Sequence, residues 1–311
     1  ENIVGEQLVG CGFNEILNNS MSKTSYYKGL NVYTEETTVK VVNPLSADLG
    51  VMRQTLLFGG LESIMRNVNR KSPNLRFFEF GNCYHYNPDK KDEDCPINAY
   101  AEETHLALWL TGKRVSGSWI HPDESTSFYE LRAYVQNILR RVGMPQGMLV
   151  MEKTDNNVFS NGVVLKNRGG KSFVEMGIVS TALLKQNDID VPVFYADLHW
   201  DNIVKAVRKS VVSFKEISKY PSVSRDLALL LDNEIEFEQV ERVAFQSEKK
   251  LLKKVELFDV YQGDKLPVGK KSYAVNFVLQ DEQATLNDKK IDAIMSKLIA
   301  NLKKQLGAEL R

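Results

Sequence analysis

The final third of the chain carries the pattern that most restricts its fold, because strand and helix periodicities follow one another in a fixed order. Every second residue between 272 and 280 is apolar or aromatic, which predicts a strand with one buried face. The expected elements are, in order, strand 226–231, helix 236–248, strand 255–261, strand 272–280, a helix begun by a capping pattern at Thr285 and Asp288, and strand 308–310. The order is therefore βαββαβ.

A βαββαβ order predicts a ferredoxin-like domain, in which both helices cover one face of a four-stranded sheet. The alternation places seven side chains under the helices: Leu227, Leu229, Phe258, Val260, Tyr273, Val275 and Phe277. The positions expected on the open face are Ala228, Asp259, Tyr261, Ser272, Ala274 and Asn276. The open face is thus small, polar and aromatic.

The open face has the chemistry of a surface for an unpaired nucleobase. The ring of Tyr261 can stack on a base, while the carboxylate of Asp259 and the hydroxyl of Ser272 can bind the edge of that base. Three nearby lysines are candidate phosphate contacts: Lys265, Lys270 and Lys271. A tyrosine on an open sheet face is also typical of a protein contact, and ligand-sensing modules share this topology, so both alternatives stay open.

The sequence before residue 213 predicts a separate α+β domain. Apolar residues recur at helical spacing in 56–68 and 128–139. The strand-like runs are 76–86, 105–110, 148–152, 173–180 and 193–198. This interleaving favours hairpins over parallel crossovers. A break in the pattern at 215–221 leads us to expect two domains, 1–212 and 213–311.

Composition excludes several classes of protein. Among 311 residues, 40 Lys+Arg balance 40 Asp+Glu, so any basic patch that attracts nucleic acid has to be local. A hydrophobic fraction of 43% indicates a folded globular chain. Three cysteines favour a reducing compartment, and the apolar runs are too short to cross a membrane, so we expect a cytoplasmic protein. The start at Glu1, without a leader pattern, indicates a piece of a longer protein.

Several short motifs carry a family resemblance over essentially the whole chain. In the final third they are 220–228, 257–263, 269–272, 285–288 and 307–311. Together these strongly resemble the ferredoxin-fold anticodon-binding domain that ends the β subunit of bacterial phenylalanyl-tRNA synthetases. In the first part they are 43–46, 51–53, 67–70 and 77–81. These are similar to the class II synthetase-like antiparallel sheet core of the same subunit, so the resemblance identifies a C-terminal fragment.

The resemblance implies a role in a ligase that joins phenylalanine to tRNA-Phe with ATP and Mg²⁺. Such enzymes are α2β2 heterotetramers with the chemistry in the α subunit, so this chain would pair with that subunit and bind no cofactor itself. The residues that match the family's anticodon contacts are Ala228, Asp259, Tyr261 and Ser272. The matching aromatic ring stacks on the first anticodon base. Two differences, Ala284 and Asn276, replace residues that are often basic in relatives. They imply either weaker contact with phosphates or a contact moved to Lys271 and its neighbours.

No catalytic or metal site is expected in this chain. Arg76 and Glu79 match an arginine and an acidic residue of class II synthetases, but no Gly-x-Gly segment followed by arginine comes later. Residues 167–171 predict a hairpin turn rather than a phosphate loop. Four residues suggest zinc but fit no compact ligand spacing: Cys83, His85, Cys95 and His105. A nucleophile elbow of the Gly-x-Ser-x-Gly type is missing from the sequence as well.

Three hypotheses follow from the sequence. The first is a non-catalytic synthetase subunit that contacts a catalytic partner and the tRNA anticodon. The second is a regulatory module that senses a small ligand on the ferredoxin-like domain. The third is a general single-strand RNA-binding protein, which would accept loops unrelated to the anticodon of tRNA-Phe. Binding of RNA or of free amino acids distinguishes them.

Overall fold

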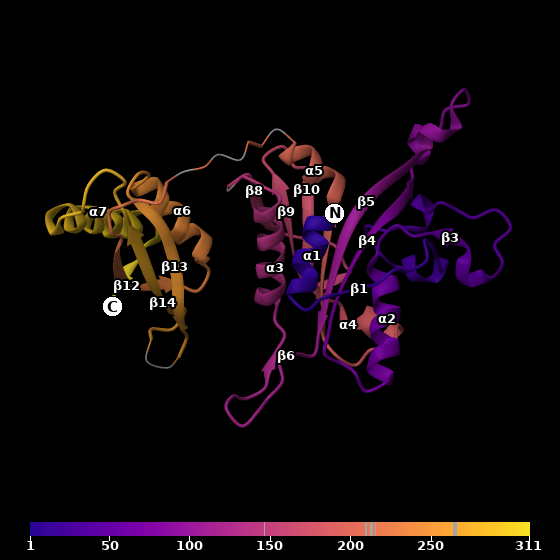
Figure 1. Ribbon diagram of the computed structural model, residues 1–311, viewed down its shortest axis with the longest axis horizontal. Coiled ribbons are helices and arrows are strands. Elements are labelled where there is room, and N and C mark those ends of the chain that lie inside the picture. Colours follow the sequence, from indigo (N-terminus) through magenta and orange to yellow (C-terminus); the bar gives the residue numbers. More distant parts are fainter. Residues whose placement is uncertain (146, 209, 212–213, 215, 264–265) are drawn as a thin grey trace. The chain divides into compact units, whose positions relative to one another are not determined.

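The computed structural model describes every residue except 146, 209, 212–213, 215 and 264–265. The chain divides into two compact units, Glu1–Val212 and Ser213–Arg311 (Figure 1). Each unit has its own hydrophobic core, and the two are described separately. None of the described helices is both long enough and apolar enough to cross a membrane.

The first unit is built on a seven-stranded sheet with the order β1-β4-β5-β11-β10-β9-β8. Its strands are β1 (Asn14–Glu15), β4 (Leu75–Tyr86), β5 (Tyr100–Thr111), β8 (Leu149–Lys153), β9 (Phe159–Asn167), β10 (Ser172–Val179) and β11 (Val193–His199). All neighbours are antiparallel except β1, which pairs parallel with β4. The predicted α+β class with an antiparallel sheet is confirmed.

Helices cover both faces of this sheet. They are α1 (Asn2–Gly10), α2 (Leu57–Asn69), α3 (Phe128–Arg141), α4 (Thr181–Gln186) and α5 (Trp200–Val207). Apolar side chains of α2 and α4 join one core, and those of α1, α3 and α5 join the other. Figure 1 shows α2 and α3 on opposite sides of the sheet. The sheet is therefore the middle layer of three.

Shorter elements complete the first unit. Two small ribbons are β2 (Met21–Ser22) with β3 (Val51–Met52) and β6 (Lys113–Val115) with β7 (Glu124–Ser125). The short 3₁₀ helices are Thr24–Tyr27, Glu35–Thr37, Ala47–Leu49, Pro88–Lys90 and Pro96–Ala99.

The sequence patterns miss β9, α1 and α4. Strand β9 contains two asparagines and a glycine, residue types depleted in strands, so its pattern is weak. Its pairing with β10 nevertheless runs almost its full length and sets Gly162 opposite Gly177. The expected hairpin turn at 167–171 is confirmed, because the Asn167 backbone N–H donates to the carbonyl of Lys171 at 3.0 Å.

The second unit has the predicted βαββαβ order and a four-stranded antiparallel sheet, β13-β14-β12-β15. Its elements are β12 (Val223–Asp232), α6 (Phe237–Ser247), β13 (Leu252–Tyr261), β14 (Lys270–Leu279), α7 (Asp288–Leu306) and β15 (Glu309–Leu310). Both helices contribute to one core with the odd-numbered apolar and aromatic residues of β12 and β14. This is the expected ferredoxin-like arrangement.

The start of α7 differs from the expected capping pattern at Thr285. The N-cap is Asn287, whose side chain accepts a hydrogen bond from the Lys290 backbone N–H at 2.9 Å. Asn287 stands directly before the first helical residue, where an asparagine oxygen reaches the third N–H of the helix. Thr285 lies two residues too early for that bond.

The predicted alternation fails at one point in β13. Leu257 pairs with Val275 and Asp259 pairs with Ala274, so Phe258 is the extra residue of a β-bulge. Phe258 is 60% exposed, so its predicted place under the helices is wrong, and Leu257 packs against the core instead. Val260 pairs with Tyr273 and so lies on the helix side as predicted, although it is 48% exposed near the end of the strand.

Candidate nucleic-acid interface

One face of the second sheet is left uncovered by α6 and α7, and we call it the helix-free face. Its members are Ala228, Asp259, Tyr261, Ser272, Ala274 and Asn276. Across the strands, Ala274 pairs with both Ala228 and Asp259, and Ser272 pairs with Tyr261. The register therefore places the four residues that were predicted to contact the anticodon on three neighbouring strands, β13, β14 and β12.

The helix-free face offers a ring, two polar groups and a flat apolar surface. Asp259 is exposed, whereas Ser272 in the central strand β14 is only 6% exposed. Ala228 and Ala274 lie on the same face as Asp259 and Ser272, and their side chains are single methyl groups. A planar ligand can therefore lie close to the sheet next to the ring of Tyr261.

The ring of Tyr261 has close neighbours on two sides. A Cβ atom at Gly263 would lie 2.7 Å from the Tyr261 hydroxyl oxygen, so a larger residue there would require the ring to shift. The guanidinium of Arg311 lies 5.3 Å from the centre of the ring, within the range of a cation–π contact. Arg311 was not among the predicted site residues. It directly follows β15, and its backbone N–H donates to the carbonyl of Ala228 at 3.0 Å.

The three candidate phosphate contacts have different surroundings. Lys270 pairs with Asp232 in the register of the helix-free face, and its Nζ lies 3.2 Å from a carboxylate oxygen of Glu309. Lys271 lies on the helix side, where its Nζ donates to the carbonyl of Asn233 at 2.8 Å and stands over the Tyr273 ring. The structure does not bring Lys271 to the helix-free face.

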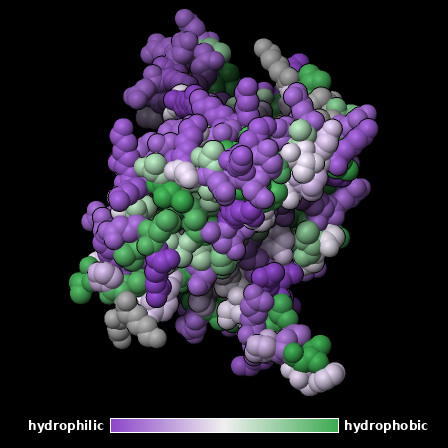
Figure 2. Space-filling model, turned by 90° about the vertical axis from the view of Figure 1, so that its left-hand side faces the viewer, coloured by the Kyte–Doolittle hydropathy of each residue, from purple (hydrophilic) through white to green (hydrophobic). Residues whose placement is uncertain are grey.

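Lys265 lies outside the described residues. Asn276, one of the two differences from relatives, lies on the helix-free face and donates a side-chain hydrogen bond to Asp226. Ala284 is exposed in the loop before α7. The space-filling view in Figure 2 shows a mainly hydrophilic surface with hydrophobic residues in several separate places.

In the first unit, Arg76 and Glu79 do not form a shared site. They are three residues apart on β4, and a strand sends such side chains to opposite faces. A guanidinium nitrogen of Arg76 lies 3.2 Å from Glu130 on α3. Glu79 is fully buried on the other face and lies 2.7 Å from the guanidinium of Arg53. Each residue is engaged in its own ion pair.

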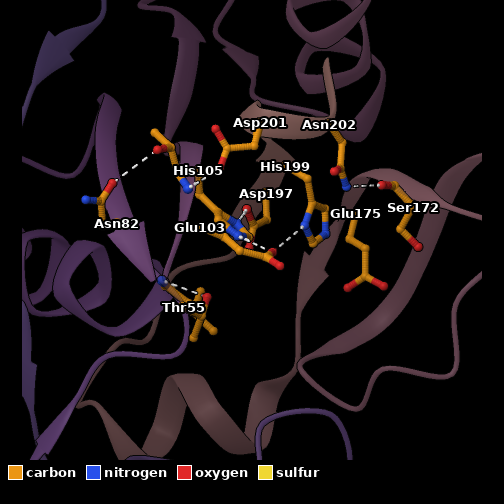
Figure 3. Close-up of polar contacts among 12 residues, drawn as sticks. Thr55, Asn82, Glu103, His105, Ser172, Glu175, Asp197, His199, Asp201 and Asn202 are labelled. Carbon is orange, nitrogen blue, oxygen red and sulfur yellow. Dashed lines mark hydrogen bonds and ion pairs between the residues drawn. The ribbon is translucent and has the colours of Figure 1, made fainter. Parts of the chain in front are cut away.

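A different set of polar residues meets at the end of β11. Among the described residues, Glu103, His105 and His199 form the one group of three ligand-type side chains close enough to share an ion (Figure 3). Of the four residues weighed for zinc from the sequence, only His105 belongs to it. Glu103 and His199 join the group because β5 pairs with β11, which sets His105 opposite His199. A local sequence pattern does not reveal this pairing, so the sequence did not predict the group.

Electrostatics in this group is dominated by carboxylates. Asp197 lies 2.6 Å from Nδ1 of His105, and both residues are buried. Burial disfavours a charge on the imidazole, but Asp197 and Glu103 outweigh that effect and raise the pKa of His105 to about 10. The facing rings of His105 and His199 lower the pKa of Glu103.

Family models match both units. Residues 1–200 match the family described as phenylalanyl tRNA synthetase beta chain CLM domain. Residues 218–311 match the family described as ferredoxin-fold anticodon binding domain.

Similar curated proteins span this chain completely. The phenylalanine–tRNA ligase beta subunits of Bacteroides fragilis and Bacteroides thetaiotaomicron are 56% identical to it over 311 residues. That of Porphyromonas gingivalis is 47% identical over the same length. In each case the match covers 100% of this chain and 38% of the relative, so the chain spans well under half the length of these relatives.

Among solved structures, a pyrrolysyl tRNA synthetase of Desulfitobacterium hafniense has a TM-score of 0.48 at 16% identity. The superposition covers 68% of this chain and 71% of that one. A likeness at this level supports no inference about the present chain.

Proposed function

Because the chain belongs to the phenylalanyl-tRNA synthetase β chain family, we propose that it is the non-catalytic β-subunit portion of a phenylalanine–tRNA ligase. In this role it pairs with the catalytic α subunit of an α2β2 heterotetramer and binds the anticodon of tRNA-Phe during ATP-dependent aminoacylation. ATP and Mg²⁺ are then used by the whole enzyme, at the α subunit.

The observation that supports anticodon binding best is the meeting of Ala228, Asp259, Tyr261 and Ser272 on the helix-free face. The ring stacks on an unpaired base, and stacking tolerates any base because each has a π-face. The Asp259 carboxylate accepts hydrogen bonds from N–H groups on the base edge, and the Ser272 hydroxyl donates or accepts. The side chain of Ala228 is small enough for the base to approach the sheet.

Arg311 also takes part in the proposed binding of the anticodon base. Its guanidinium covers a face of the Tyr261 ring, so a base that stacks on that face displaces the guanidinium. The displaced cation remains near the RNA and can contact a phosphate, which is the usual role of arginine at such surfaces. Tyr261 is thereby covered by a planar cation when no base is bound.

The lack of shared geometry between Arg76 and Glu79 supports a non-catalytic role for the first unit. Adenylate chemistry needs a cation for the phosphate and carboxylates for Mg²⁺ at one place, and these two side chains lie on opposite faces of the sheet. In the proposed function the sheet and its two helical layers serve as a surface for the α subunit.

Aminoacylation assays with and without a phenylalanine-specific α subunit test the proposal. The chain alone is expected to bind the tRNA-Phe anticodon arm but to catalyse no phenylalanine-dependent exchange of pyrophosphate into ATP. Exchange and charging appear only when the α subunit is added. ATP-dependent turnover by the chain alone, surviving Arg76→Ala, would refute the proposal.

Two binding controls address the alternatives. Equal affinity for unrelated RNA loops would favour a general single-strand RNA-binding protein. Saturable binding of an amino acid in calorimetry, with no binding of the anticodon arm, would favour a ligand-sensing module.

A further inference from the structure

The group Glu103, His105 and His199 has its side chains on one face of the first unit's sheet. His105 on β5 and His199 at the end of β11 are direct cross-strand partners, and Glu103 precedes His105 by two residues. Residues with these relations share a face of a sheet. Figure 3 shows the Glu103 carboxylate directed toward the two rings.

The spacing within the group fits an ion better than it fits hydrogen bonds. A carboxylate oxygen of Glu103 lies 3.7 Å from Nε2 of His105 and 3.9 Å from Nδ1 of His199. Both distances exceed the range of a hydrogen bond. All three ligand atoms lie within 4.8 Å of one another. Tetrahedral bonds of about 2.0–2.2 Å to a central cation put ligand atoms about 3.3–3.6 Å apart, so the side chains would close in on the ion when it binds.

A second reason to expect an ion is a buried nitrogen of His105 that lacks a hydrogen-bond partner. Its side chain is 3% exposed, and its Nε2 has no hydrogen-bond partner although it is buried. An unsatisfied buried nitrogen is costly, and an ion is one recognised explanation for it. Nε2 points into the group because Nδ1 faces Asp197 at 2.6 Å. A carboxylate behind a histidine is the usual arrangement that orients a metal ligand.

The group is also open to solvent on one side. The side chain of Glu103 is 49% exposed and that of His199 is 26% exposed. A cation can therefore enter from solvent and keep a water molecule as a fourth ligand. The backbone around Glu103 is fixed by Asp201, whose carboxylate accepts a hydrogen bond from the Thr104 N–H at 3.1 Å.

We propose that Glu103, His105 and His199 bind one divalent transition-metal ion, with Asp197 as the residue that orients His105. Two imidazole nitrogens and one carboxylate suit Zn²⁺ or Co²⁺, whereas Mg²⁺ prefers oxygen ligands and water. The cation displaces the proton that the neighbouring carboxylates favour on Nε2 of His105, while the Nδ1–H continues to donate to Asp197. The site goes beyond the proposed function, which requires no metal in this chain, and it differs from the zinc set weighed in the sequence.

Titration of the chelator-treated 311-residue chain with Co²⁺ tests this site. We expect visible d–d absorption that saturates at one Co²⁺ per chain, is abolished by one equivalent of Zn²⁺ and is unaffected by excess Mg²⁺. His199→Asn and Glu103→Gln change partly exposed ligands and should remove the absorption. His121→Asn is the matched control, since His121 is exposed in a loop away from the group, and should leave it unchanged.

Thermal unfolding provides a second readout. Zn²⁺ should raise the melting temperature of the parent chain and of His121→Asn but not that of His199→Asn, because a ligand that binds only the folded state stabilises it. Asp197→Asn should weaken Co²⁺ binding by about 10- to 100-fold. Absence of saturable Co²⁺ absorption in the parent chain, or equal binding by His199→Asn, would overturn the site.

Discussion

At the scale of single residues, Tyr261 depends on neighbours that are distant in the sequence. Gly263 leaves space for the hydroxyl end of the ring, Ser272 lies across from it, and Arg311 covers it from the far edge strand. The alternation of β13 and β14 was enough to predict the face on which Tyr261 lies. It could not predict Arg311, because that contact depends on the order of strands in the folded sheet.

Tyr261→Ala is expected to weaken binding of the tRNA-Phe anticodon arm by about 1–3 kcal/mol, since a stacking surface is lost. Tyr261→Phe keeps the ring and should bind nearly as well as the parent chain. Fluorescence anisotropy with a labelled anticodon stem-loop measures both. Equal affinities of Tyr261→Ala and the parent would argue against the helix-free face as the binding surface.

Arg311→Ala is expected to weaken binding of the same RNA and to reduce its dependence on salt. One lost phosphate contact lowers the slope of log K against log salt by about 0.7–0.9. Arg311→Lys retains the charge and should keep most of the slope. Tighter binding by Arg311→Ala would mean that the guanidinium only blocks the ring.

Among the secondary-structure elements, β4 carries a buried ion pair. Glu79 is fully buried, and its carboxylate contacts Arg53 and the side chain of Asn18. A Cβ atom at Gly81 would lie 2.2 Å from the Arg53 guanidinium, so the glycine of the Phe-Glu-Phe-Gly motif makes space for that cation. Packing around Arg53 therefore explains the glutamate and the glycine of this motif.

Glu79→Ala is expected to destabilise the first unit by about 3–5 kcal/mol, because the buried guanidinium of Arg53 loses its counter-ion. The double variant Arg53→Met with Glu79→Leu removes both charges and should recover most of that loss. Urea unfolding followed by circular dichroism gives the comparison. A loss below about 1 kcal/mol for Glu79→Ala would show that the pair contributes little.

The sequence predicted elements best where periodicity was long and apolar. Helices α2, α3 and α7 and strands β4, β12 and β14 were found from their patterns. Strand β9 was missed because its asparagines and glycine give no strand signal, although β10 pairs with it. The bulge at Phe258 was also missed, since one extra residue in a ladder leaves no local trace.

At the scale of the whole chain, the two units have separate cores. Every described core residue of the ferredoxin-like unit comes from residues 229–308, and those of the first unit come from residues 4–203. The group of Glu103, His105 and His199 belongs entirely to the first unit, while the helix-free face belongs to the second. Changes at one are therefore expected to leave the other intact.

Leu298→Ala tests this independence. Leu298 on α7 is fully buried, so its truncation should destabilise the second unit by about 2–5 kcal/mol and leave the first unit's transition unchanged. Ser296→Ala, at an exposed position of the same helix, is the control. Differential scanning calorimetry resolves the two transitions. A joint shift of both would contradict separate cores.

A double-mutant cycle between Tyr261→Ala and removal of the first anticodon base from the stem-loop of tRNA-Phe tests whether the ring stacks on that base. The parent chain is expected to lose about 1–3 kcal/mol of binding free energy when the base is removed. Tyr261→Ala should lose almost nothing, so that the two changes are strongly coupled. Equal losses for both proteins would show that the Tyr261 ring does not stack on this base and would contradict anticodon binding at the helix-free face.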